Sequence, residues 1–266
     1  KDACYKVDVH LMPNLPGASV ESDRRMFERM LYEPGLQADQ WKIYPCEITP
    51  WTVIKKWYDS GEWVPYAKDA LLDVVATAKS HVKPWVRLNR VIRDIPSQYI
   101  LGGIDAPNLR QQLLQRMAQS GRVCRCIRCR EVGADSEKMA PRAELVVRRY
   151  RASGGVEYFL SYEADGGKVI LGFCRLRFSR SAGVVAPAAQ SAAVGDGAAA
   201  PVVFEELRGA ALIRELHVYG QLVATDDAAQ PQHARGADAA SQHQGFGRRL
   251  LACAEQMARR LGYRRV

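Results

Sequence analysis

The sequence predicts an α/β protein with two folded parts, and three observations lead to this prediction. Strand and helix signals alternate from residue 1 to about residue 95, which favours parallel βαβ units. Residues 141–266 instead begin with two β-rich runs around a glycine turn and end in an amphipathic helix. The intervening residues 96–140 hold a cluster of cysteines. We therefore expect domains at 1–95 and 141–266, joined by a metal-binding linker at 96–140.

The first part is predicted to contain three strands, in YKVDVHLMP, WKIYPC and WVRLNRVIRDI. Helices are expected at Ser22–Tyr32 and from about Lys68 to Ser80, where apolar side chains recur at helical spacing. Another helix is expected to begin at Thr49-Pro50, with threonine as its N-cap, and to end at Gly61. Three such strand and helix units do not close a barrel, so they are predicted to be the end of a larger domain.

The second part is predicted to be α+β. Val156–Phe178 reads as two strands around Asp165-Gly166-Gly167, residue types that supply the positive φ angles of a tight hairpin turn. Two alanine-rich stretches, near 181–203 and 224–241, have low complexity, and ALIRELHVYGQLV between them reads as a strand. The last helix is amphipathic, and its apolar side chains are Leu250, Leu251, Ala254, Met257, Ala258 and Leu261.

The composition is that of a globular protein, with 47% hydrophobic and 25% charged residues. No apolar run reaches the roughly 18 residues that a membrane span needs, so no membrane partner is expected. The net charge of +9 is concentrated in Lys83–Arg151, which has 15 Lys and Arg against 6 Asp and Glu. A basic segment of this kind favours a polyanionic partner such as nucleic acid, with a solvated basic surface as the alternative.

Three of the seven cysteines, Cys124, Cys126 and Cys129, lie within six residues. Disulfides between such close neighbours would be strained, whereas a thiophilic metal accepts the spacing, and zinc is the metal we expect. Coincidental free thiols are the alternative, and the fourth ligand stays open between His81, Cys46 and several carboxylates. The arginines of this segment are expected to point outward, toward phosphates: Arg122, Arg125, Arg128 and Arg130.

An anion site is predicted at the start of the last helix, in SQHQGFGRRLL. Glycines let the backbone approach a ligand, and the first-turn N–H groups and the helix dipole favour a phosphate there. A glycine loop followed by solvated arginines is the alternative. The preceding strand, RELHVY, could pair with the amides of an extended ligand, and coenzyme A combines two amides with a pyrophosphate. Glu215 or His217 could act as a general base, although a charged residue on a strand surface is more often inert.

Several motifs occur in order along nearly the whole chain: HLMPNLPGASVESDRRMFE, DQWKIYPCEITPWTVIKKW, NLRQQLLQRM, CRCIRCREVG, FLSYE, IRELHVYG and QHQGFGRRLL. Together they resemble the catalytic subunit of Elongator, a tRNA-modifying radical SAM acetyltransferase. The resemblance implies part of a TIM-type radical SAM barrel, a metal-bearing linker and a GNAT α+β domain. It also implies that acetyl-CoA and S-adenosylmethionine are used to carboxymethylate carbon 5 of the wobble uridine of tRNA.

The resemblance also implies site residues by position. A zinc ion is expected on the three clustered cysteines, and no catalytic residue is assigned. Acetyl-CoA is expected to contact Glu215, Leu216, His217, Val218, Gln242, Gln244, Gly245, Phe246, Gly247 and Arg248. The iron–sulfur cysteine motif of the family is expected upstream of Lys1, so none of the seven cysteines is predicted to bind that cluster. The last GNAT segment is expected beyond Val266, so the chain by itself is predicted to bind little acetyl-CoA.

The partners implied by the resemblance are tRNA, other Elongator subunits in a eukaryote, and a second copy of the chain in a homodimer. The expected location is the cytoplasm, with the nucleus as the alternative. Two other functions stay open. One is a GNAT-type N-acetyltransferase of a protein or small amine, and the other is an inactive fragment that binds RNA or a partner subunit.

Overall fold

The computed structural model describes residues 1–104, 106, 108–184, 204–220 and 245–266. These residues form two compact units, which are described separately. The parallel unit is Val7–Cys129, and the antiparallel unit is Lys1–Lys6 together with Arg130–Val266. The division into 1–95, 96–140 and 141–266 stays a prediction, and most of the two low-complexity stretches lie outside the described residues.

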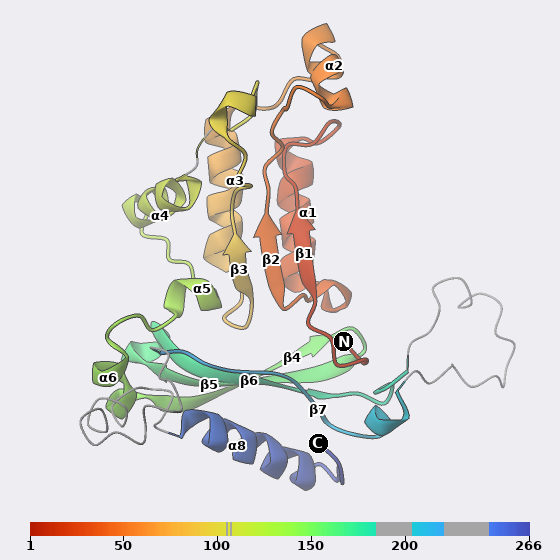
Figure 1. Ribbon diagram of the computed structural model, residues 1–266, viewed down its shortest axis with the longest axis vertical. Coiled ribbons are helices and arrows are strands. Elements are labelled where there is room, and N and C mark those ends of the chain that lie inside the picture. The colour runs from red at the N-terminus through yellow and green to blue at the C-terminus, as the bar shows by residue number, and fades with distance from the viewer. Residues whose placement is uncertain (105, 107, 185–203, 221–244) are drawn as a thin grey trace, which may run out of the picture. The chain divides into compact units, whose positions relative to one another are not determined.

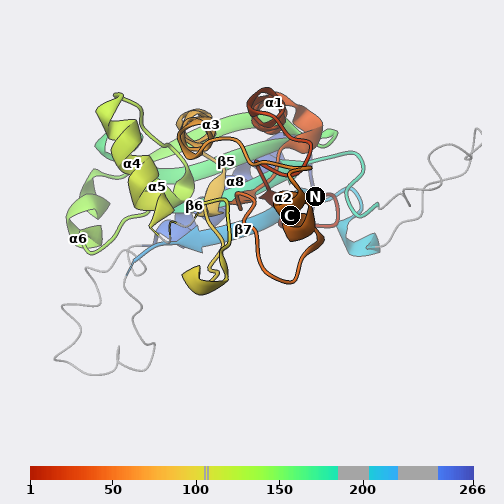
Figure 2. The same ribbon diagram turned by 90° about the horizontal axis from the view of Figure 1, so that it is seen from above.

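The parallel unit is built on a three-stranded parallel sheet in the order β1, β2, β3. Its strands are β1 (Asp8–Leu11), β2 (Gln40–Ile43) and β3 (Arg87–Arg90). Its helical elements are α1 (Val20–Tyr32), η1 (Pro34–Leu36), α2 (Val53–Ser60), α3 (Lys68–His81), η2 (Ser97–Tyr99) and α4 (Leu109–Gln119). Figures 1 and 2 show α1 and α3 side by side along the sheet. The prediction of parallel βαβ units that form an arc of a barrel is confirmed.

The start of helix α1 is fixed by a capping box between the N-cap residue Ser19 and Ser22 in the first turn. The Ser19 hydroxyl accepts from the Ser22 amide at 3.2 Å, and the Ser22 hydroxyl accepts from the Ser19 amide at 2.8 Å. This capping box explains why the helix begins at Val20, two residues before the predicted start. On the apolar face of the helix, Phe27 packs against Trp41 of β2 with ring centroids 6.4 Å apart.

The predicted start of α2 at Thr49-Pro50 is wrong. The Thr52 hydroxyl donates to the Thr49 carbonyl at 2.9 Å and closes a turn, so the helix begins only at Val53. Ile48, just before this turn, forms a β-bridge with Gly102. The turn at residues 49–52 therefore lies between an extended residue and the helix. The predicted end is confirmed, because Gly61 adopts φ of 76°, which suits glycine after a helix.

The antiparallel unit is a four-stranded sheet in the order β4, β5, β6, β7, with α8 packed on one face (Figure 1). Its strands and long helix are β4 (Glu144–Ala152), β5 (Gly155–Ala164), β6 (Val169–Phe178), β7 (Leu212–Val218) and α8 (Phe246–Arg260). Short turns complete it: α6 (Ser136–Met139), η3 (Ala140–Arg142), η4 (Asp165–Gly167) and η5 (Glu205–Leu207). Leu160, Leu176 and Leu250 are fully buried between the sheet and α8.

The hairpin prediction is confirmed at the β5 and β6 turn. Asp165, Gly166 and Gly167 have φ of 52°, 62° and 84°, the left-handed backbone that the turn requires. Strand β4 was not predicted, although ELVVRRYRA shows a partial alternation of apolar and charged residues. It is an edge strand, and because it contains several arginines its sequence is more typical of a surface segment than of a sheet interior.

The sheet face opposite α8 carries a buried ion cluster. Glu157 on β5 accepts from Arg177 Nη1 on β6 at 3.2 Å and from Arg214 Nη2 on β7 at 2.7 Å. All three side chains are 0% exposed. Arg177 also binds Asp2 at 2.8 Å, so the first residues of the chain are tied into the same unit.

Candidate functional site

The start of α8 is shaped for close approach to the end of β7. Gly245 is the N-cap with φ of 72°, and the first intrahelical hydrogen bond runs from the Arg249 amide to the Gly245 carbonyl at 3.0 Å. The amides before Arg249 have no acceptor within the helix. A Cβ on Gly247 would lie 3.5 Å from Val218 Cγ2, an ordinary van der Waals distance, so the start of α8 lies beside the end of β7 without requiring glycine at position 247.

Around this helix start, the predicted residues differ in exposure. Phe246 is 1% exposed and packs on Tyr162 with ring centroids 4.7 Å apart, so its side chain anchors the helix to the sheet. Arg248 is exposed, as a phosphate contact requires. Gln242 and Gln244 lie outside the described residues.

Strand β7 has an open outer edge. It is the last strand of its sheet and pairs only with β6 among the described strands. A bulge opposite Arg175 and Leu176 places Arg214 and Glu215 on the same face of the strand. Beyond the bulge Leu216 and His217 are exposed, and Val218 is half-buried. No other strand in the part of the chain that the structure describes pairs with this edge, and the Ile213 carbonyl accepts from Cys4 Sγ at 3.5 Å. An extended ligand could pair with such an edge.

Glu215 is not placed to act as a general base. Its carboxylate accepts from Arg175 Nε at 2.8 Å and forms an ion pair with Lys6 Nζ at 2.7 Å. Burial acts to raise the pKa of Glu215, but Arg175 and Lys6 outweigh it and hold the pKa below its ordinary value of 4.5. The carboxylate is thus a structural charge on the strand. His217 is exposed, stacks on Phe173 with ring centroids 6.0 Å apart, and contacts Tyr219 in a tilted arrangement at 4.4 Å.

Glutamine at position 215 should change the acid stability of the protein. Since the folded-state pKa of Glu215 lies below its unfolded value, its stabilisation is complete above about pH 4.5 and is lost as the pH falls through the folded-state pKa. We expect Glu215→Gln to lower the free energy of unfolding at pH 7 by about 1–3 kcal/mol. The variant should also show a shallower loss of stability below pH 4.5, measured by urea unfolding across pH. Glu206→Gln, at an exposed site, should leave the pH profile unchanged, and a Glu215→Gln profile parallel to that of the wild type would contradict the assignment.

The structure brings the three clustered cysteines together. Their sulfur atoms all lie within 4.8 Å of one another, and ligands on one tetrahedral zinc ion would be about 3.8 Å apart. The turn α5 (Ile127–Arg130) makes this possible, because it folds Cys129 back over Cys126. The Ile127 amide donates to the Val86 carbonyl at 2.9 Å, which fixes the cluster beside β3.

The electrostatics of the cluster favour a thiolate. Hydrogen bonds from Cys124 and Cys129 hold the pKa of Cys126 well below its ordinary value, whereas the pKa of Cys124 is raised. The Lys79 ammonium, which is 0% exposed, donates to Cys124 Sγ at 3.7 Å. A buried positive charge beside three sulfurs suits a metal site, because metal ligation requires deprotonated thiols.

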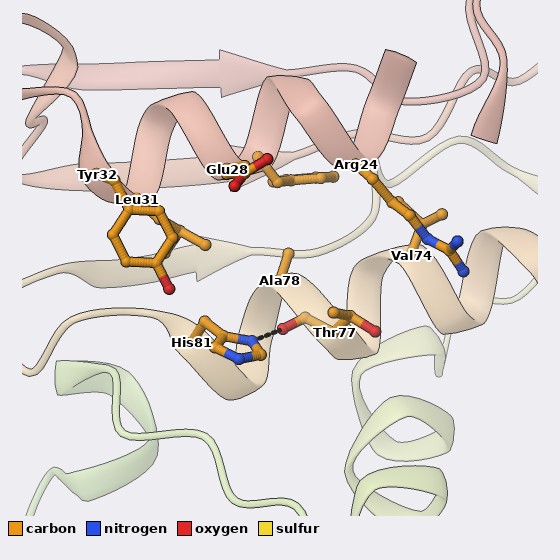
Figure 3. A pocket seen from close by; sticks show the side chains of 9 residues that line it. Arg24, Glu28, Leu31, Tyr32, Val74, Thr77, Ala78 and His81 are labelled. Atoms are coloured by element: carbon orange, nitrogen blue, oxygen red, sulfur yellow. Dashed lines mark hydrogen bonds between the residues drawn. The ribbon is translucent and has the colours of Figure 1, made fainter. Parts of the chain in front are cut away.

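No fourth His, Cys, Asp or Glu ligand joins the cluster among the described residues. His81 instead donates Nδ1–H to the Thr77 carbonyl at 2.9 Å, at the rim of a groove of about 250 Å³ between α1 and α3 (Figure 3). Cys46 belongs to a separate apolar cluster with Ile48 and Trp63. The structure thus gives no support to either of these two proposed ligands.

The expectation that all four arginines point outward is wrong for Arg130. Arg130 is 5% exposed, and its Nη1 lies 2.8 Å from the carboxylate of Glu163. Glu163 is itself 3% exposed and also accepts from both Nη atoms of Arg148, at 2.6 and 2.8 Å. Arg125 and Arg128 are exposed as expected, and Arg122 is half-buried.

None of the described helices is long and apolar enough to cross a lipid bilayer.

Comparison with known proteins gives a consistent set of relatives. A family model described as the Radical_SAM C-terminal domain matches residues 38–119. The chain is 34% identical over 264 residues to a tRNA uridine(34) acetyltransferase of Methanocaldococcus jannaschii, covering 97% of this chain and 44% of that protein. It is 36% identical over 262 residues to Elongator complex protein 3 of Saccharomyces cerevisiae, covering 97% and 43%.

A solved structure shows the same likeness. The archaeal Methanocaldococcus infernus Elp3 with an N-terminus deletion (1–46) superposes with a TM-score of 0.79 at 33% identity, over 98% of this chain and 57% of that chain. The chain therefore spans less than half the length of the two named curated relatives and somewhat more than half of the solved one.

Proposed function

Because the chain belongs to the family of Elongator complex protein 3 and tRNA uridine(34) acetyltransferase over nearly all of its length, we propose that it forms part of an enzyme that modifies the wobble uridine of tRNA. The observation that most supports this is the identity of 34–37% across 96–97% of the chain with relatives from archaea, bacteria and eukaryotes. The proposed reaction is carboxymethylation with acetyl-CoA and S-adenosylmethionine. The alternatives are N-acetylation of a protein or small amine, and RNA or partner binding without catalysis.

Within the whole protein, the antiparallel unit is proposed to supply part of the acetyl-CoA site, while the chain by itself is still expected to bind little acetyl-CoA. The open edge of β7 would pair with the pantetheine amides, with Leu216 and His217 exposed along it. The helix dipole and first-turn amides of α8 would hold the pyrophosphate, beside Arg248. The position of Gly247 beside Val218 supports this, because it places those amides near the end of β7. Gln242 and Gln244 remain proposed contacts on sequence grounds.

Zinc is proposed on Cys124, Cys126 and Cys129. The fit rests on the sulfur separations of at most 4.8 Å and on the buried Lys79 charge beside them. Such an ion would act as a structural crosslink that fixes the turn between α4 and β4. The family also implies S-adenosylmethionine and an iron–sulfur cluster, which supply radical chemistry when bound, and no residue of this chain is assigned to that cluster.

The basic segment Lys83–Arg151 is proposed to bind tRNA. Its charge excess is as large as that of the whole chain, and Arg149 and Arg151 on β4 are exposed. Other Elongator subunits and a second copy of the chain are proposed as protein partners, and the cytoplasm as the location.

Binding of a tRNA with uridine at the wobble position tests this proposal. We expect tight binding at low salt and an affinity that falls about a hundredfold between about 50 and 200 mM salt, as about four phosphate contacts would give. Replacing Arg149 and Arg151 with alanine should reduce the slope of log affinity against log salt by about 2, measured by fluorescence anisotropy.

The matched control removes two arginines from the end of α8. Arg259 and Arg260 are also exposed, so their replacement by alanine changes the net charge equally but should alter the salt slope by less than about 0.5. Absence of tRNA binding at low salt would contradict the proposal and leave acetylation of a protein or small amine as the better function.

A further inference from the structure

One face of the three-stranded parallel sheet is polar. Helices α1 and α3 pack on the other face (Figure 1), where the strands bury their apolar side chains: Leu11, Trp41, Ile43 and Leu88. Successive side chains of a strand point to opposite faces, so the polar face carries the alternate residues: Asp8 and His10 of β1, Gln40 and Lys42 of β2, and Arg87 of β3. All of them are exposed or half-buried. Because parallel sheets normally bury apolar residues on both faces, a polar face indicates contact with a polar partner.

Lys42 holds two side chains of β1 on this face. Its Nζ lies 3.1 Å from Asp8 Oδ2 and 3.4 Å from His10 Nε2. Because an ammonium group only donates, Nε2 accepts, and the proton of the neutral imidazole is on Nδ1. His10 is exposed, and its Nδ1–H has no partner among the described residues. The polar face therefore presents a donor whose tautomer is fixed.

Tyr44, the residue after β2, fixes the orientation of this imidazole. The two rings meet edge to face, with centroids 5.2 Å apart and an angle of 84° between their planes. The Tyr44 hydroxyl has no hydrogen-bond partner within the part of the chain that the structure describes. His10 and Tyr44 thus lie side by side toward the carboxyl ends of β1 and β2, the end at which barrels of parallel strands bind their ligands.

The groups at this position favour a neutral ligand with carbonyl oxygens. Asp8 offsets the charge of Lys42, so the pair does not favour a free anion. The Tyr44 hydroxyl donates and accepts, whereas His10 Nδ1–H only donates. Uracil is a neutral ring with two carbonyl oxygens, and cytosine carries an amino group in place of one of them. A fixed donor therefore distinguishes the two pyrimidines.

A pair of exposed aromatic rings favours RNA as the source of such a base. Trp51 and Tyr99, on the segments that follow β2 and β3, are 79% and 38% exposed, with ring centroids 5.4 Å apart. The bridge between Ile48 and Gly102 holds these two segments together. Unpaired bases of RNA stack on exposed rings of this kind.

We propose that the polar face of the parallel sheet binds the uracil base of the wobble uridine, and that His10 is the residue that selects it. Nδ1–H donates to the O4 carbonyl of uracil. The amino group of cytosine at the same place would leave two donors facing each other without an acceptor. This inference rests on the proposed function, because the uridine that it names is the nucleotide on which that function acts.

The test is a comparison of two RNA stem-loops that differ only in uridine or cytidine at the wobble position. We expect the wild type to bind the uridine RNA about tenfold more tightly at low salt, measured by fluorescence anisotropy. His10→Phe keeps the ring beside Tyr44 but removes the donor. Its two affinities should agree within about twofold, with the affinity for the cytidine RNA unchanged.

His10→Asn and His10→Asp are isosteric with each other and keep the inference testable if the phenylalanine variant does not fold. Asparagine supplies an N–H donor and should keep at least about a threefold preference for uridine. Aspartate only accepts, so it should prefer the amino group of cytidine by at least about twofold. Equal preferences in these two variants would overturn the proposal.

His81→Phe is the matched control, because His81 is an exposed histidine of the same unit that lies at the end of α3. It should keep the preference for uridine. A loss as large as that in His10→Phe, or a wild type that binds both RNAs equally, would overturn this site alone. Absence of binding of either RNA would instead contradict the proposed function, and this site with it.

Discussion

Replacement of Glu157 by leucine is expected to lower the free energy of unfolding by about 3–5 kcal/mol. The carboxylate lies between Arg177 and Arg214, at 3.2 and 2.7 Å, and all three side chains are 0% exposed. Removing it leaves the buried Arg214 guanidinium without this carboxylate and leaves Arg177 with Asp2 as its counter-charge, so the cost of burying the two guanidinium groups is no longer fully offset. Urea unfolding at pH 7 measures the change.

Two further variants separate the charge from the packing. Glu157→Gln keeps a similar volume and one acceptor oxygen but loses the charge, so an intermediate loss of stability is expected. Glu255→Gln breaks an exposed ion pair with Arg259 at 3.6 Å and should cost less than about 0.5 kcal/mol. A loss below about 1 kcal/mol in Glu157→Leu would show that the cluster does not hold the sheet together.

The elements predicted correctly are those with a strong local signal. Helix α3 has apolar residues at helical spacing, and the β5 and β6 hairpin has Asp165-Gly166-Gly167 at its turn. The start of α2 could not be predicted locally, because it depends on a bridge between Ile48 and Gly102, far apart in the sequence. Strand β4 is not predicted from the sequence because it lies at the edge of its sheet. An edge strand is partly exposed, and ELVVRRYRA therefore contains the charged residues that are typical of a surface segment.

In the candidate site, too, features with a local sequence signal were predictable and those that depend on distant residues were not. Spacing alone indicated that Cys124, Cys126 and Cys129 could meet, because all three lie on one tight turn. Glycine at 245 likewise follows from a local need, because the N-cap of α8 has φ of 72°. Partners that arrive from distant strands were not predictable: Glu163 draws Arg130 inward, and Arg175 and Lys6 neutralise Glu215. The sequence shows the charges of these residues but not the register that pairs them.

Replacement of Cys126 by serine is expected to abolish metal binding. Cys126 is 0% exposed and its sulfur lies within 4.8 Å of those of Cys124 and Cys129, so it is one of the three ligands of the proposed zinc site. Serine is nearly isosteric, but its hydroxyl is a poor zinc ligand at neutral pH. We expect zinc content to fall from about one ion per chain to below about 0.1, measured by elemental analysis, because two thiolates do not hold the ion.

The loss of metal should also be a loss of stability, since ligands are brought together only in the folded state and binding energy is then folding energy. We expect the free energy of unfolding of Cys126→Ser to be several kcal/mol lower than that of the zinc-loaded wild type. It should equal the free energy of unfolding of the wild type treated with a chelator. Cys253→Ser, which removes a half-buried thiol on α8, should keep both zinc and stability. Full zinc retention in Cys126→Ser would contradict the zinc site, and so would a metal-free wild type as stable as the zinc-loaded one. In either case the three thiols would lie close together only because α5 folds back on itself.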